Sequence, residues 1–286
     1  MAVQGRDPVP ELPEVETVRA GLAAKLLGRR LAHVELRRKD LRVPFPSGFA
    51  KRLEGRRLID AGRRGKYLLL TFDDETVLLA HLGMSGRMVL HQGPPEKPKL
   101  HEHVAFRFDD DVSVAFSDPR RFGLMLLTTV AEAPQHPLLA AMGPEPLGPD
   151  FHAAYLAEEF SGKRAPLKNA LMDQRVVAGL GNIYVCEALY RAGLSPDRAA
   201  ESVRPRAIAG LVAAVRAVLT DAIAAGGSSL RDYVQASGEL GYFQDRWSVY
   251  GREGERCPGC KPGARCRVQR VTQGGRSTFF CPRRQR

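Results

Sequence analysis

The sequence predicts an α+β protein: an amino-terminal β-sandwich with flanking helices, then a helical part, then a short cysteine-bearing β-hairpin module. Three observations predict this fold class. Short apolar runs separated by acidic turns fill residues 31–130, prolines gather in residues 134–149, and cysteines interrupt short β-segments from about residue 246. A chain of 286 residues is long enough for two domains of ordinary size.

The first element is a helix that begins near Pro13 and ends near Gly28. Proline suits the first helical position, where a missing N–H costs nothing. Glu14 and Glu16 fall in the first turn, where the helix dipole favours negative charge, and Gly28 is a natural C-cap. The residues predicted to form one apolar face are Val15, Val18, Leu22 and Leu26. Taken alone, this is a capped surface helix.

Acidic turns between apolar runs predict two β-hairpins, with the turns at residues 73–75 and 109–111. The strands that flank or follow these turns are residues 67–72, 76–82, 104–108, 112–116 and 124–127. Several short strands at this spacing are typical of a β-sandwich.

The prolines of residues 134–149 mark the domain boundary, because the apolar period becomes helical after them. Helices are predicted at residues 156–160, 166–172, 183–192 and 206–225, with Gly226 and Gly227 closing the last. Residues 179–182, Gly-Leu-Gly-Asn, form a tight turn with Asn182 as N-cap of the next helix. Such a turn presents N–H groups to an anion, although the local sequence alone favours an ordinary capped turn.

Composition and charge favour a protein without a membrane span that contacts a nucleic acid. Hydrophobic residues make up 44% of the chain, no apolar run approaches membrane-span length, and the amino terminus lacks a signal-peptide h-region. We therefore expect a cytoplasmic protein with no membrane partner. The formal net charge is +11, and a net +8 lies in residues 247–286. A basic module beside a cysteine cluster favours contact with the phosphates of a nucleic acid.

Five cysteines, most of them late in the chain, fit a metal site better than a disulfide framework. Cys257 and Cys260 have the spacing of half a tetrahedral zinc site, and Cys281 is a third ligand candidate. Cys266 is the only other thiol of the module, and no histidine follows His152. Either Cys266 completes a zinc-ribbon-like β-hairpin, or the hairpin holds together without metal, or zinc binds weakly. Cys186 lies on an apolar helix and is expected in the core.

Residues 10–17, Pro-Glu-Leu-Pro-Glu-Val-Glu-Thr, resemble the amino-terminal signature of the formamidopyrimidine-DNA glycosylases, bacterial enzymes that remove oxidised purines from DNA. In that family the proline is the first residue of the mature chain, and its secondary amine attacks a sugar carbon. Here residues 1–9 precede Pro10, and an internal proline nitrogen is an amide without a nucleophilic lone pair. We expect residues 1–9 to be an extension missing from the mature enzyme, removed by proteolysis or bypassed by a start codon at Val9.

The resemblance implies four catalytic residues. Pro10 would be the nucleophile and Glu11 would give acid–base assistance at the sugar. Lys66, in the basic stretch 63–67, matches a family lysine that precedes an apolar strand, and Arg276, in residues 273–279, matches the arginine at the tip of the finger hairpin. Without the resemblance, Lys66 is an exposed basic strand end.

The resemblance also implies contacts to DNA. Met84 and Phe122 would fill the stack that an extruded base leaves, and Arg120 would hydrogen-bond the orphaned partner base. His101 matches a family histidine that contacts DNA and is otherwise a solvent-facing histidine. Residues 166–184 are similar to the family's helix–two-turns–helix, whose phosphate contacts map to Lys168 and Asn182, with Arg164 a weaker candidate. Residues 228–243 correspond to a loop that covers the flipped base.

The expected domains are residues 10–142, the catalytic sandwich; residues 143–245, the helix–two-turns–helix domain; and residues 246–286, the zinc-finger-like module. The family has a second Cys-x-x-Cys, whereas this chain has Arg284 at the place of the fourth ligand. The cofactor implied is one zinc ion, and Cys266 is the candidate for its fourth ligand. The partner implied is double-stranded DNA with oxidised bases or abasic sites, bound by a monomer.

The function implied is a bifunctional DNA glycosylase and AP lyase for 8-oxoguanine and formamidopyrimidines, ending in β,δ-elimination. One alternative is an endonuclease VIII-like enzyme for oxidised pyrimidines, which Leu12 disfavours because that group has glycine there. The other is a catalytically silent DNA-binding protein in which Pro10 stays blocked.

Overall fold

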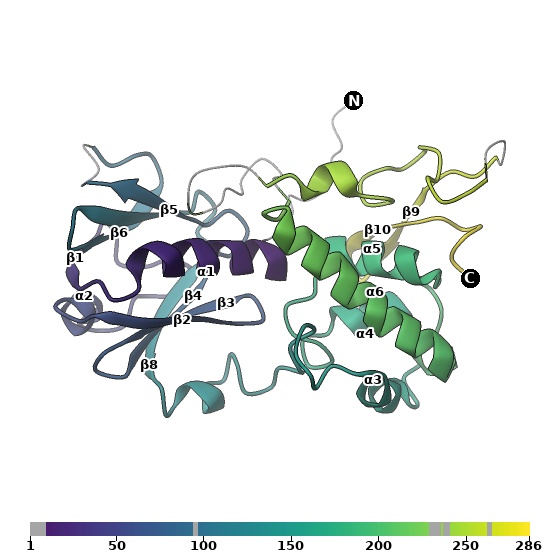
Figure 1. Ribbon diagram of the computed structural model, residues 1–286, viewed down its shortest axis with the longest axis horizontal. Helices are drawn as coiled ribbons and strands as arrows, with labels where there is room; N and C mark the ends of the chain where they lie inside the picture. The colour runs from purple at the N-terminus through teal and green to yellow at the C-terminus, as the bar shows by residue number, and fades with distance from the viewer. Residues whose placement is uncertain (1–9, 94–96, 229–235, 237–240, 262–264) are drawn as a thin grey trace. The chain divides into compact units, whose positions relative to one another are not determined.

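The computed structural model describes residues 10–93, 97–228, 236, 241–261 and 265–286, and the chain forms two compact units. The sandwich unit contains residues 10–140 and the described part of 223–244, and the helical unit contains residues 141–222 and the described part of 245–286. Figure 1 shows the elements of both units. The division into three domains with boundaries after residues 142 and 245 stays a prediction, and the extension 1–9 lies outside the described residues.

The sandwich unit holds two four-stranded antiparallel sheets (Figure 1). In spatial order, one sheet consists of β1 (Leu31–Leu36), β6 (Glu102–Phe108), β7 (Val112–Ser117) and β5 (Arg87–Gln92). The other consists of β2 (Leu58–Arg64), β3 (Tyr67–Phe72), β4 (Thr76–His81) and β8 (Leu124–Thr129). The predicted hairpins are β3–β4 and β6–β7, whereas β1, β2 and β5 had no prediction.

Helix α1 (Leu12–Leu26) shares one apolar core with both sheets. The predicted face of Val15, Val18, Leu22 and Leu26 is buried, together with side chains of each sheet such as Leu70 and Phe106. Gly28, just beyond the helix, has a φ of +82°, which a residue with a Cβ rarely adopts. The unit also contains α2 (Phe49–Leu53) and the 3₁₀ turn η1 (Ala133–Gln135). The predicted β-sandwich with flanking helices is confirmed.

In chain order, the helical unit contains α3 (Ala153–Phe160), α4 (Leu167–Met172), α5 (Asn182–Ala192), the 3₁₀ turn η2 (Ala200–Ser202) and all but the last two residues of α6 (Pro205–Ala224). Its hairpin consists of β9 (Gln269–Gln273) and β10 (Arg276–Phe280). A further 3₁₀ turn, η3 (Phe243–Arg246), spans the point in the sequence where the chain passes from one unit to the other. The four helices begin and end within a few residues of their predictions. One detail is corrected: Gly181 is the N-cap of α5, and Asn182 is its first helical residue.

Helix α6 corrects the expectation that no apolar run approaches membrane-span length. Among the described residues it is the one helix long and apolar enough to cross a membrane by length and composition, with a mean hydropathy of 1.8 over its best window. Its buried side chains include Ile208, Leu211, Val215 and Leu219, which recur at helical spacing. Such a face also characterises the core helix of a folded domain.

Candidate functional site

The amino end of α1 carries two buried carboxylates next to Pro10, which is itself buried. Glu11 is 3% exposed, and its backbone N–H donates to Glu14 Oε2 at 3.0 Å. The second oxygen of Glu14 accepts from the backbone N–H of Ser228 at 2.8 Å, which ties the helix start to the segment after α6. The helix dipole favours negative charge here, so the fold can keep acidic groups beside Pro10.

The turn between β2 and β3 carries Lys66 and is fastened to α1. Arg63 Nε donates to Glu16 Oε2 at 2.8 Å, and Arg63 also donates to the carbonyl of Gly65 at 2.9 Å. Burial raises the pKa of Glu16, but hydrogen bonds from Arg19 and Arg63 outweigh it and hold the pKa below its usual value. Glu16 is thus an anion, and its bond to Arg63 fixes the turn of Lys66 to α1, the helix that follows Pro10.

His81 belongs to this region, although the sequence analysis did not select it. Its ring lies 4.8 Å from that of Tyr67, and its Nδ1 accepts from the backbone N–H of Gly83 at 2.9 Å. Burial, together with the positive charges of Lys66 and Arg42, lowers the pKa of His81 to about 4. A neutral imidazole therefore stands beside Lys66 at neutral pH. In the sequence, the only feature that could have pointed to His81 was its place at the end of an apolar strand.

The depressed pKa of His81 predicts a pH-dependent stability. The unfolded chain takes up this proton near pH 6.5 and the folded chain only near pH 4, so the free energy of unfolding falls as pH drops through that window. Because the ring is partly exposed, we expect the free energy of unfolding to fall by about 1 to 3 kcal/mol over this pH range. Thermal unfolding at pH 7 and pH 5 should show a larger loss for the wild type than for His81→Gln. Equal losses would contradict the assignment.

Two loops of the sandwich unit bring the predicted wedge residues together. The guanidinium carbon of Arg120 lies 5.1 Å from the centre of the Phe122 ring, and Phe122 is 45% exposed. Gly83 has a φ of +69°, and a Cβ on it would lie 2.4 Å from backbone atoms of Phe122 and Gly123. The loop of Met84 and the loop of Phe122 therefore touch backbone to backbone. An exposed aromatic ring capped by a cation suits insertion between bases.

In the helical unit, two predicted phosphate ligands converge on the hairpin behind Arg276. Lys168 is 1% exposed, and its Nζ donates to Thr278 Oγ1 at 2.7 Å. Asn182 Nδ2 donates to the carbonyl of Ser277 at 2.9 Å. Arg276 is the exposed first residue of β10. Lys168 and Asn182 thus fix the two residues of β10 that directly follow Arg276.

Three further residues complete the placement of the predicted contacts. Arg164 is not drawn into the hairpin: its side chain is 91% exposed and lies 3.9 Å from Glu201. His101 is exposed at a φ of +66° before β6. Tyr250, which the sequence analysis did not select, accepts a 3.4 Å hydrogen bond from Asn182 Nδ2 through its hydroxyl. Residues 229–235 and 237–240 of the predicted base-covering loop lie outside the described residues.

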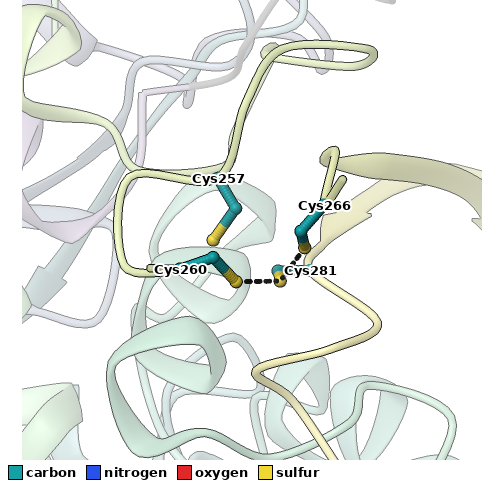
Figure 2. A group of neighbouring side chains, drawn as sticks. All are labelled: Cys257, Cys260, Cys266 and Cys281. Carbon is teal, nitrogen blue, oxygen red and sulfur yellow. Dashed lines mark hydrogen bonds between the residues drawn. The ribbon is translucent and has the colours of Figure 1, made fainter. Parts of the chain in front are cut away.

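Four cysteines of the module gather at one point (Figure 2). The sulfur atoms of Cys257, Cys260, Cys266 and Cys281 all lie within 4.8 Å of one another. The Sγ atoms of Cys266 and Cys281 are 3.2 Å apart, too far for a disulfide. Four thiolates around one zinc ion at 2.3 Å would be separated by roughly 3.8 Å. The set could therefore hold a metal ion in a closed four-coordinate site, with Cys266 at the place of the fourth donor.

Arg284, at the position where a second Cys-x-x-Cys would end, takes a different role. Its guanidinium carbon lies 5.0 Å from the centre of the Tyr190 ring. The hydroxyl of Tyr190 in turn lies 3.4 Å from Cys257 Sγ and accepts from the backbone N–H of Gly259 at 2.9 Å. Arg284 thus packs on the tyrosine that contacts Cys257. This role is compatible with a ligand set in which Cys266 takes the fourth place.

Comparison with known proteins agrees with this geometry. The family model for the formamidopyrimidine-DNA glycosylase N-terminal domain matches residues 9–125, and that for the formamidopyrimidine-DNA glycosylase H2TH domain matches residues 142–234. The formamidopyrimidine-DNA glycosylases of Rhodospirillum centenum and Acidiphilium cryptum are each 54% identical to this chain, over 97% of it and 100% of their own length.

Solved structures show the same similarity. The MutM (Fpg) protein of Thermus thermophilus superposes with a TM-score of 0.84 at 40% identity, covering 96% of this chain and 98% of that one. A Lactococcus lactis FPG mutant in complex with Fapy-dG-containing DNA superposes with a TM-score of 0.87 at 33% identity, covering 97% and 100%.

A β-sandwich whose first helix follows a proline–glutamate pair, joined in sequence to a helical unit with a four-cysteine hairpin, defines a DNA-repair glycosylase. The chain belongs to the formamidopyrimidine-DNA glycosylase family.

Proposed function

We propose that this protein is a bifunctional DNA glycosylase and AP lyase that excises oxidised purines, chiefly 8-oxoguanine and formamidopyrimidines. The observation that carries the proposal is the amino end of α1, where Pro10 is followed by buried Glu11 and Glu14 and is linked through Glu16 and Arg63 to the turn of Lys66. Relatives have been solved with Fapy-dG-containing DNA and with abasic-site DNA, which supports this substrate class.

The chemistry requires a free amine on Pro10. Its lone pair attacks C1′ of the damaged nucleotide, the bond to the base breaks, and the base leaves with a proton. Loss of the amine proton and opening of the sugar give an iminium, with Glu11 assisting proton transfer at the ring oxygen. The iminium acidifies C2′–H, so that β-elimination expels the 3′ phosphate, and a second elimination expels the 5′ phosphate. Lys66 and Arg276 stabilise the phosphates as they depart.

The active form of the protein therefore begins at Pro10. The family match starts at residue 9, the position that an initiator methionine would occupy in front of this proline. The relatives cover 97% of this chain over their full length, and the remainder is about as long as residues 1–9. Initiation at Val9 followed by loss of the methionine, or trimming of a longer precursor, would each expose the amine.

DNA is held by two sets of residues. Met84 and Phe122 occupy the stack of the extruded base while Arg120 bonds its partner, and His101 contacts the strand nearby. Asn182, Arg164 and Arg276 bind phosphates. The predicted phosphate contact of Lys168 is not retained, because its side chain is 1% exposed and its Nζ is bonded to Thr278, so that it supports the hairpin of Arg276 instead. Each phosphate that an arginine neutralises releases counterions, so affinity should fall as the salt concentration rises. The protein acts as a monomer in the bacterial cytoplasm, associated with DNA.

One structural zinc ion is the proposed cofactor, bound by Cys257, Cys260, Cys266 and Cys281. A tetrathiolate zinc supplies no step of the reaction and serves to fold the loop ends that flank β9 and β10. With these segments folded, the hairpin of β9 and β10 holds Arg276 at its tip.

A lesion comparison tests the proposed function. The Pro10-terminal protein should cleave an 8-oxoguanine duplex much faster than a thymine-glycol duplex of the same sequence, and should leave an undamaged duplex intact. Faster cleavage of thymine glycol would favour the endonuclease VIII-like alternative. Binding without cleavage of either duplex by the Pro10-terminal form would favour a silent DNA-binding protein.

A further inference from the structure

Asp118 is a buried carboxylate that the proposed chemistry does not use. It follows β7, has an exposed fraction of 0%, and uses both side-chain oxygens. One oxygen accepts from the hydroxyl of Ser85 at 2.5 Å, and the other accepts from the backbone N–H of Gly123 at 2.7 Å. A carboxylate is expensive to bury unless such donors satisfy it. The fold thus keeps a buried, fully hydrogen-bonded acidic side chain at a point where no catalytic step needs one.

Each partner of Asp118 is adjacent to a predicted DNA contact. Ser85 follows Met84, and its hydroxyl oxygen also accepts from the backbone N–H of Arg120 at 3.1 Å. Gly123 follows Phe122. The backbone N–H of Asp118 donates to the carbonyl of His101 at 3.0 Å.

Neighbouring groups close the same junction. The carbonyl of Asp118 is bonded by His103 Nε2 at 2.9 Å. A Cβ at position 123 would lie 2.8 Å from the Phe116 ring and 3.0 Å from Asp118 Oδ2, so the loop after Phe122 has no room to shift toward the core. Three segments that are separate in the sequence therefore meet at Asp118, two of them through its carboxylate and the segment of His101 and His103 through its backbone.

We propose that Asp118 is the positioning residue of the wedge, holding Met84, Arg120, Phe122 and His101 in one arrangement before DNA binds. The inference rests on the proposed function, since it assumes that these four residues act on the duplex. Preorganisation matters because the wedge must hold apart bases that favour the stacked state. A loop that moves freely would support the opened base stack less effectively than a loop that is already fixed.

The test compares a substrate that needs the wedge with one that does not. Single-turnover excision of 8-oxoguanine from a duplex requires base extrusion, whereas borohydride trapping on a single-stranded abasic oligonucleotide does not. For Asp118→Asn and for Ser85→Ala, we expect duplex excision to fall by roughly 10- to 100-fold while trapping changes by less than about 3-fold. Ser113→Ala removes another buried hydroxyl, bonded to the Gly93 carbonyl, and serves as matched control.

A second readout follows the wedge directly. A 2-aminopurine placed opposite the lesion should brighten on binding of the wild type, because its stacking is disrupted, and should brighten less with Ser85→Ala. Unchanged duplex excision in both variants, or equal loss on both substrates, would overturn the inference. If Asp118→Asn fails to fold, Ser85→Ala decides alone. A wild-type Pro10-terminal protein inactive on both substrates would instead overturn the proposed function and, with it, this role.

Discussion

A form of the protein that begins at Pro10 is expected to excise 8-oxoguanine at least ~10³-fold faster than a form that retains residues 1–9, as removal of a nucleophile does in other covalent catalysts. In the longer form the nitrogen of Pro10 is an amide whose lone pair is delocalised into the peptide bond. The residues assigned to DNA contact are the same in both forms, so the longer form should still bind the lesion duplex. Single-turnover rates of the two forms, each checked by intact mass, provide the measurement.

A matched variant separates the amine from its surroundings. Glu11→Gln in the Pro10-terminal form leaves the amine free and keeps a polar side chain at a position that is 3% exposed. Base excision should be lost because the amide cannot supply the proton-transfer chemistry at the sugar, while the melting temperature should change little. Comparable rates for the two amino-terminal forms would refute the role of the Pro10 nitrogen, whatever the variant does.

Replacing Cys266 by serine is expected to have the second-largest effect. Three thiolates leave a zinc ion with an open position, which structural sites avoid. The wild type should carry one zinc per chain, and Cys266→Ser should carry much less. Because the hairpin that presents Arg276 depends on the cluster, affinity for a lesion duplex should fall by roughly 10- to 100-fold. Atomic absorption and fluorescence anisotropy measure the two quantities.

Two further variants make the Cys266 experiment specific. Cys186→Ala removes a cysteine that is buried on α5 and is not one of the four clustered thiols, so it should keep the metal. The double variant Cys266→Ser with Arg284→Cys restores a second Cys-x-x-Cys and should regain zinc. Full zinc occupancy in Cys266→Ser alone would show that Cys266 is not the fourth ligand.

Elements whose pattern is local were predictable from the sequence. The strand over residues 67–72 was predicted to the residue, because an acidic turn bounds an apolar run. Helix α6 was predicted within one residue at each end, since Gly226 and Gly227 stop it. By contrast, β2 contains Asp60, Gly62 and two arginines, and its strand conformation comes from pairing with β3.

The site shows the same division between local and long-range information. The short motifs around Pro10, Lys66 and Cys257 pointed to candidate residues without any structure. The burial of Lys168 could not be foreseen, because it is set by Thr278, 110 residues away in the sequence. Asp118 and His81 likewise acquire their significance only when separate loops meet around them. Packing partners distant in the chain leave no periodic signal.

Peptide mapping of the protein–DNA adduct tests the central claim most directly. The Pro10-terminal protein would be mixed with an 8-oxoguanine duplex and borohydride, digested, and sequenced by mass spectrometry. We predict that the reduced sugar is attached to the nitrogen of Pro10 in the amino-terminal peptide. An adduct on Lys66 or any other side chain, or an efficient adduct formed by protein that still carries residues 1–9, would contradict it.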